Sequence, residues 1–129
     1  KGAEIIFYPT AIGWPDANRK NKAYFDKAEH EAWQITQRSH AIDNHVFVAA
    51  VNRVQPEKHL NFWGTSFVCD PYGVVLQKAS SNKEENLVAE CDLSLIDMKR
   101  KDWPFLKERR VKCEIPPLAL PKNSSARSG

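Results

Sequence analysis

The fold is decided by a stretch near the middle of the chain, His45-Val46-Phe47-Val48-Ala49-Ala50-Val51-Asn52-Arg53-Val54. Because this stretch is rich in β-branched and aromatic side chains, it predicts a buried strand. A second apolar run lies upstream and is closed by proline, Ala3-Glu4-Ile5-Ile6-Phe7-Tyr8-Pro9. A run that is apolar at nearly every position predicts a strand that is buried on both faces and lies centrally in a sheet.

The residues between these two strands predict a helix. Asp26 and Glu29 have the spacing of a capping box, so the helix is expected to begin near Asp26 and to end near Asn44. Apolar side chains recur every three to four positions and predict the face that packs on the sheet: Phe25, Ala28, Ala32, Ile35 and Ile42. A strand, a helix and a strand in this order predict parallel strands joined by a right-handed crossover.

A hairpin is expected downstream. Residues 65–69 and 74–77 flank Asp70-Pro71-Tyr72-Gly73, where Asp, Pro and Gly occupy positions that a type I turn favours. The polar residues 13–22 and 55–61 are expected to be loops, and residues 87–91 a third pairing strand. Asp92 or Ser94 is expected to cap a short helix that packs Leu93 and Ile96 inward before Pro104 interrupts the pattern.

The composition is that of one globular unit. The chain has 129 residues, of which 42% are hydrophobic and 27% charged. No apolar stretch is long enough to span a bilayer, and the first residues do not resemble a signal peptide, so a cytoplasmic protein without a membrane partner is expected. We expect residues 1–110 to form one domain and residues 111–129, rich in proline and small polar residues, an irregular tail.

The net charge of +3 is too small to predict nucleic-acid binding by itself. Seven basic residues nevertheless crowd one segment: Lys99, Arg100, Lys101, Lys107, Arg109, Arg110 and Lys112. Asp102 and Glu108 interrupt the segment, so a solvated helix face is favoured over a phosphate-binding patch.

The residues themselves supply no self-contained active site. The chain lacks a glycine-rich phosphate loop and a GxSxG motif, and its three cysteines have no metal-ligand spacing, so no metal or organic cofactor is expected. Cys69 and Cys91 fall in predicted strands, where a thiol is a common core residue, and Cys113 precedes the expected tail. None of the three is favoured as a nucleophile.

Five blocks of sequence follow one another in a recognisable order. They are Gly2-Ala3-Glu4-Ile5-Ile6-Phe7-Tyr8-Pro9-Thr10-Ala11-Ile12-Gly13; Trp33, Gln37, His40, Ala41 and Asn44; Val51-Asn52-Arg53; Phe62-Trp63-Gly64-Thr65-Ser66-Phe67 with Asp70-Pro71-Tyr72-Gly73; and residues 100–110. Together they resemble the nitrilase superfamily of carbon–nitrogen hydrolases. The first block is similar to the strand that follows the nucleophile elbow in N-carbamoylputrescine amidases.

The resemblance implies an α/β (α+β) fold, a four-layer αββα sandwich of which this chain supplies part. It also implies a catalytic Glu, Lys and Cys that all lie upstream of Lys1, so this chain contains no catalytic residue and is expected to be inactive alone. Thr10, Ala11 and Ile12 are expected to line the substrate pocket. Asp16 is the candidate acceptor for the distal ammonium of the substrate, since such a charge needs a carboxylate or carbonyl partner.

The function that the resemblance implies is hydrolysis of a non-peptide C–N bond in a small molecule, with N-carbamoylputrescine yielding putrescine, carbon dioxide and ammonia. Another amidase, a ureidopropionase or a nitrilase proper stays open. A homo-oligomer is expected. A function from another class, a non-catalytic module that binds nucleic acid through residues 99–112, is the competing hypothesis.

Overall fold

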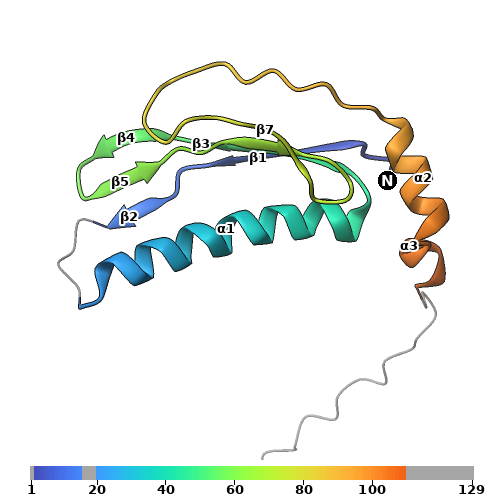
Figure 1. The fold of residues 1–129 in the computed structure, drawn as a ribbon, viewed down its shortest axis with the longest axis horizontal. Helices are drawn as coiled ribbons and strands as arrows, with labels where there is room; N and C mark the ends of the chain where they lie inside the picture. The colour runs from blue at the N-terminus through green and yellow to red at the C-terminus, as the bar shows by residue number, and fades with distance from the viewer. Residues whose placement is uncertain (1, 16–19, 110–129) are drawn as a thin grey trace, which may run out of the picture.

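The structure, a computed structural model, describes residues 2–15 and 20–109. Its elements are β1 (Ile5–Thr10), β2 (Gly13–Pro15), α1 (Lys22–Asn44), β3 (Phe47–Asn52), β4 (Val54–Glu57), β5 (Leu60–Trp63), β6 (Phe67–Cys69), β7 (Val75–Lys78), α2 (Ser94–Asp102) and α3 (Phe105–Glu108). The strands form one sheet in the order β1-β3-β6-β7 and another in the order β2-β5-β4. Helix α1 runs lengthwise along one face of this sheet layer, and α2 and α3 stand at one end (Figure 1).

The predicted strand–helix–strand unit is confirmed. β1 and β3 pair in parallel, from Ile5 opposite Phe47 to Thr10 opposite Asn52, and α1 connects them. β3 is the buried strand that its composition predicted, because only Val51 among its residues is exposed.

The predicted hairpin is also confirmed, with β6 and β7 antiparallel around Asp70-Pro71-Tyr72-Gly73. The Gly73 N–H donates to the Asp70 carbonyl at 2.9 Å, which is the hydrogen bond of a β-turn. Asp70 Oδ1 accepts from the N–H groups of Tyr72 and Val74 at 2.8 and 2.9 Å, so its side chain holds the turn.

The prediction that the first strand lies centrally and is buried on both faces is wrong for this chain. β1 is the edge strand of its sheet, and its residues alternate between exposed and half-buried. The side chain of Phe7 is 67% exposed. Pro9 lies within the strand, which an edge position allows because the missing N–H has no neighbouring strand to face.

The two polar segments predicted as loops contribute a second sheet instead. β2 lies within residues 13–22, and β4 and β5 form a hairpin around Lys58 and His59. Gly13 is required here, since a Cβ at that position would lie 2.3 Å from the Asn61 carbonyl oxygen of β5. These strands were missed because each has only three or four residues and lies in or beside a polar segment.

Helix α1 begins four residues earlier than the capping box predicted and ends at Asn44 as expected. Asp26 therefore lies one turn inside the helix, where its carboxylate forms an ion pair with Lys22. The predicted buried face is wrong as well, because Phe25 and Ile35 are 42% and 62% exposed. The buried stripe consists of Trp33, Gln37 and Ala41.

Residues 87–91 are not a strand, which corrects the expected third pairing partner. The short helix α2 is confirmed, and Asp92 Oδ1 accepts from the Ser94 N–H at 3.0 Å before its first turn. Ile96 is buried as predicted, but Leu93 is 42% exposed, so only one of the two side chains packs inward. The predicted tail, residues 111–129, lies outside the described residues.

The core lies between α1 and the sheets. It consists of Trp33, Ala41, Val46, Val48, Ala50, Trp63, Phe67 and Cys69. The chain is thus mixed α/β, as predicted, with one helix layer on one sheet layer. One helix layer on one sheet layer is half of the αββα sandwich that the resemblance implies.

Candidate functional site

The predicted substrate-binding residues Thr10, Ala11 and Ile12 form one segment at the carboxyl end of β1. We call these three residues segment 10–12. The segment leaves the first sheet after the last β1–β3 pair, Thr10 opposite Asn52, and enters the second sheet at Gly13. Carboxyl ends of parallel strands are where α/β folds commonly bind ligands, so the position fits the predicted role.

The side chain of Asn52 fixes segment 10–12. Its Nδ2 donates to the carbonyl of Ile12 at 3.0 Å and to that of Gly64 at 3.2 Å. Its Oδ1 accepts from the Ile12 N–H at 3.0 Å. The Thr10 hydroxyl lies 3.1 Å from the same Oδ1 and 3.0 Å from the Val51 carbonyl, so its single proton can reach either acceptor.

The backbone of Asn52 is held as well. Its N–H donates to Ser66 Oγ at 2.9 Å, and Ser66 Oγ lies 3.2 Å from its carbonyl. Asn52 is 8% exposed, so these bonds form in a largely water-excluded place. In the sequence Asn52 stood only in the block Val51-Asn52-Arg53, and its hydrogen bonds join it to the predicted substrate segment.

A cavity of about 370 Å³ lies on the Ala11 side of the segment. Arg53 and Glu57 line it and form an ion pair with each other. The guanidinium of Arg53 also lies 4.5 Å from the centre of the Phe62 ring. Arg53 is thus a cation held in place beside Ala11, with roughly half of its side chain still exposed to solvent.

A second cavity of about 360 Å³ lies on the Ile12 side and is lined by Ile12, Gly13, Glu29, Ala32, Trp33, Thr36, Gln37 and Trp63. The ring of Trp63 contacts those of Trp14 and Trp33, and all three contact His30. Burial lowers the pKa of His30, with the positive charge of Lys78 as a smaller cause. Trp33 and Trp63 belong to the core, and Trp14 packs against it, so these rings join the cavity wall to the core.

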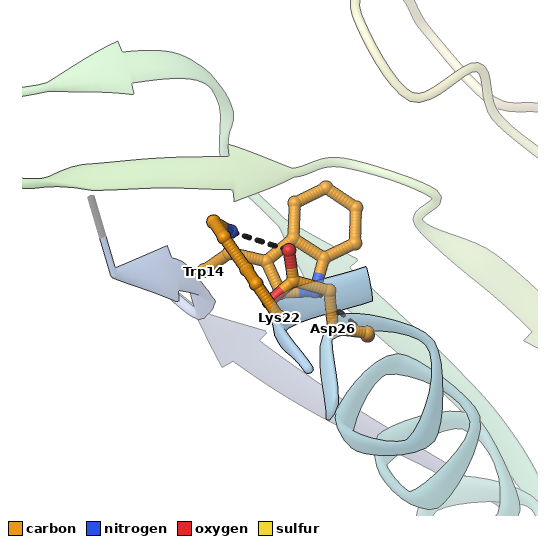
Figure 2. Close-up of polar contacts among 3 residues, drawn as sticks. All are labelled: Trp14, Lys22 and Asp26. Carbon is orange, nitrogen blue, oxygen red and sulfur yellow. Dashed lines mark hydrogen bonds and ion pairs between the residues drawn. The ribbon is translucent and has the colours of Figure 1, made fainter. Parts of the chain in front are cut away.

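The candidate ammonium acceptor, Asp16, lies outside the described residues. Trp14, two residues before it, and Lys22, the first residue of α1, both contact Asp26. The indole N–H of Trp14 donates to the Asp26 carbonyl at 2.7 Å, and Lys22 forms an ion pair with the Asp26 carboxylate (Figure 2). β2 therefore contacts α1 at Asp26.

The cysteines of the described residues are unsuited to nucleophilic attack. Cys69 is fully buried, and burial raises the pKa of its thiol to about 11. Burial also raises the pKa of Cys91. Because the thiolate is the nucleophile, a raised pKa leaves little of the reactive form at neutral pH. Cys113 lies outside the described residues.

The first lysine of the basic segment that supported the nucleic-acid hypothesis is buried and does not contribute to a charged surface. Lys99 is 1% exposed, and its Nζ lies 4.3 Å from the Tyr72 ring centre and 4.1 Å from the Trp103 ring centre. Burial lowers the pKa of Lys99. Its ammonium is used within the fold, in a cation–π arrangement between the hairpin turn and the end of α2.

In residues 2–15 and 20–109, no group of three or more His, Cys, Asp or Glu side chains is placed to hold a metal ion. Across the same residues, none of the helices has both the length and the hydropathy that crossing a bilayer requires.

Comparisons with known proteins agree with this architecture. The sequence profile of the carbon-nitrogen hydrolase family matches residues 1–101. An N-carbamoylputrescine amidase of Arabidopsis thaliana is 36% identical in an alignment 118 residues long that covers 85% of this chain and 38% of that protein. A citrullinase of Francisella tularensis is 32% identical in an alignment 114 residues long that covers 85% of this chain and 38% of that protein.

Among solved structures, a carbon-nitrogen hydrolase from Helicobacter pylori superposes with a TM-score of 0.77 at 40% identity. The match covers 85% of this chain and 39% of that one, so the chain spans well under half the length of these relatives. Since the family profile matches more than half of the chain and a solved relative shares its fold, the chain belongs to the carbon–nitrogen hydrolase family.

Proposed function

We propose that this chain is the C-terminal portion of a cysteine-dependent amidase that hydrolyses N-carbamoylputrescine. The observation that carries the proposal is segment 10–12, pinned by Asn52 at the carboxyl end of a parallel strand pair in a chain of this family. The similarity to N-carbamoylputrescine amidases supports the choice of substrate.

In the proposed reaction the nucleophilic cysteine lies in a portion of the protein outside this chain. Its sulfur attacks the carbamoyl carbon, the C–NH₂ bond breaks, and ammonia leaves with one added proton. Water then attacks the thioester-like carbon and releases the cysteine together with a carbamate. The carbamate loses carbon dioxide, and its nitrogen takes up a proton to give putrescine.

The chain itself supplies the wall against which the substrate lies. Segment 10–12 offers the surface beside the reacting group, and Asp16 is proposed to accept the distal ammonium of the substrate. The high pKa of Cys69 supports the absence of a catalytic cysteine from the described residues. The chain by itself is therefore proposed to be inactive.

Arg53 favours a second candidate substrate class. A cation fixed in the cavity beside Ala11 suits a substrate that ends in a carboxylate, such as citrulline, better than one that ends in an ammonium. The similarity to a citrullinase supports this alternative. Asp16 and Arg53 thus favour different substrates. The tail of N-carbamoylputrescine carries only an ammonium, whereas that of citrulline carries a carboxylate as well.

The experiment that tests the proposal measures ammonia release by the intact gene product with N-carbamoylputrescine and with citrulline. We expect turnover of N-carbamoylputrescine, and we expect Asp16→Asn to lower kcat/KM for it by about tenfold or more, because one charge-assisted hydrogen bond is lost. The isolated chain of residues 1–129 is expected to release no ammonia.

Two further variants complete the test. One is a control for Asp16→Asn, and the other separates the two candidate substrates. Asp102→Asn removes the same charge from the last residue of α2 and should leave kcat/KM unchanged. Arg53→Met removes the cation beside Ala11 and should affect only citrulline turnover. Preferred turnover of citrulline with loss of activity in Arg53→Met would replace the first proposal by the second.

A further inference from the structure

The side-chain amide of Asn52 forms with Ile12 the two hydrogen bonds that the backbone of a neighbouring strand would form. Its Oδ1 accepts from the N–H of Ile12, and its Nδ2 donates to the carbonyl of the same residue, both at 3.0 Å. The backbone ladder between β1 and β3 ends at the pair Thr10 and Asn52. The side chain of Asn52 therefore extends the ladder by two residues, after the backbones have separated.

The same amide also reaches the second sheet. Its other proton goes to the carbonyl of Gly64, whose own N–H donates to the Arg53 carbonyl at 2.9 Å. Two carbonyl oxygens face the amide nitrogen, while an N–H and a hydroxyl face the amide oxygen. Both donor protons are used and the oxygen faces two donors, so the amide's capacity is filled.

We infer that Asn52 is a positioning residue that fixes segment 10–12 as a rigid wall of the substrate site. The inference rests on the proposed function for its effect on substrate, and on the hydrogen bonds alone for its effect on the segment. A rigid wall lowers the cost of ordering the site when substrate binds. Only an amide of this length provides two donors and an acceptor at this place.

Neither aspartate nor alanine in place of Asn52 can form the same hydrogen bonds. An aspartate keeps an acceptor for the Ile12 N–H but sets a negative oxygen against the carbonyls of Ile12 and Gly64, in a place that is 8% exposed. An alanine leaves all these groups without a partner. A small displacement of a site wall costs up to about 100-fold in rate, so the loss should appear in kinetics.

The test compares Asn52→Ala and Asn52→Asp with Asn44→Ala in the intact gene product. Asn44 is the matched control, because its side chain also donates to a carbonyl, that of His40, at the exposed end of α1. Hydrogen exchange of the Ile12 amide is measured together with kcat and KM for N-carbamoylputrescine. Exchange at Val48, inside β3, reports on whether the sheet itself is intact.

We expect Asn52→Ala to accelerate exchange at Ile12 by about tenfold or more while Val48 stays protected. KM should rise by about tenfold with a smaller change in kcat, and Asn44→Ala should change neither. Asn52→Asp should keep the Ile12 N–H protected but still raise KM, because only the donors are lost.

Two results would overturn the inference. One is a folded Asn52→Ala protein with unchanged exchange at Ile12 or unchanged KM. The other is faster exchange throughout β3, which would make Asn52 a general structural residue. If the unsubstituted gene product turns over neither substrate, the proposed function fails, and the exchange at Ile12 alone decides whether Asn52 holds the segment.

Discussion

Strands β1 and β3 lie side by side in parallel and both read as buried strands in the sequence, yet their surroundings differ. β3 is at the interior of its sheet, and Phe47, Val48 and Ala50 have no exposed surface. β1 is at the edge, where Ile5 and Phe7 are 37% and 67% exposed. The register pairs Ile5 and Phe7 with Phe47 and Ala49, which alternate with the core residues Val48 and Ala50, so the exposed side chains lie on the other face of the sheet from the core.

This difference teaches that an apolar composition makes a strand suitable for burial. Whether the strand is buried depends on the strands and helices that pack beside it. An unpaired edge and uncovered apolar side chains are features that proteins usually protect. The relatives are more than twice as long as this chain, so the outer face of β1 is a surface that further polypeptide could cover.

The largest expected effect is on β3. Phe47→Ala should lower the free energy of unfolding by about 3–5 kcal/mol, because a fully buried ring is replaced by a cavity. Urea unfolding followed by circular dichroism measures the change. A loss below about 1 kcal/mol would mean that the surroundings of Phe47 collapse around the smaller side chain.

A smaller effect is expected at His45, the C-cap residue of α1 just before β3, and only at acidic pH. Burial lowers the pKa of His45, and the positive charges of Lys99 and Arg100 lower it further. Below the ordinary value of 6.5 the unfolded chain therefore binds a proton that the folded chain does not, and stability falls as pH falls. His30, whose pKa is also lowered, adds a slope of the same sign.

His45→Asn tests this dependence, since asparagine tolerates the left-handed backbone that His45 adopts at φ 52°. The variant should lose less Tm than the unsubstituted protein between about pH 7.5 and about pH 5.5. An identical loss of Tm in both proteins would show that His45 is not the group responsible.

The smallest effect is expected on β1. Phe7→Ala should change the stability of the isolated chain by no more than about 0.5 kcal/mol, because most of the ring is already in water. The same urea titration measures it. A loss similar to that of Phe47→Ala would break the comparison and show that the outer face of β1 is covered in solution, which size-exclusion chromatography of the two proteins would then trace to association.

Several elements followed from local sequence. The turn at Asp70-Pro71-Tyr72-Gly73 was predictable because aspartate, proline and glycine each favour one turn position. The second sheet was not, since β2, β4 and β5 have only three or four residues each and are paired with one another. The buried stripe of α1 was mispredicted because Ile35 has helical spacing but faces away from the sheet, where Trp33 packs instead.

The candidate site divides in the same way. Thr10, Ala11 and Ile12 were predicted as site residues from a resemblance in sequence, and Asn52 stood out only within the block Val51-Asn52-Arg53. Its link to Ile12, forty residues away, required the tertiary structure.

The sequence by itself determined the family, the parallel strand–helix–strand unit and the hairpin, because motifs, hydrophobic runs and turn residues act over short distances along the chain. Only the tertiary structure decided that β1 is an edge and that Asn52 clamps segment 10–12. Both depend on which distant groups come into contact, and that is a property of packing rather than of local preference.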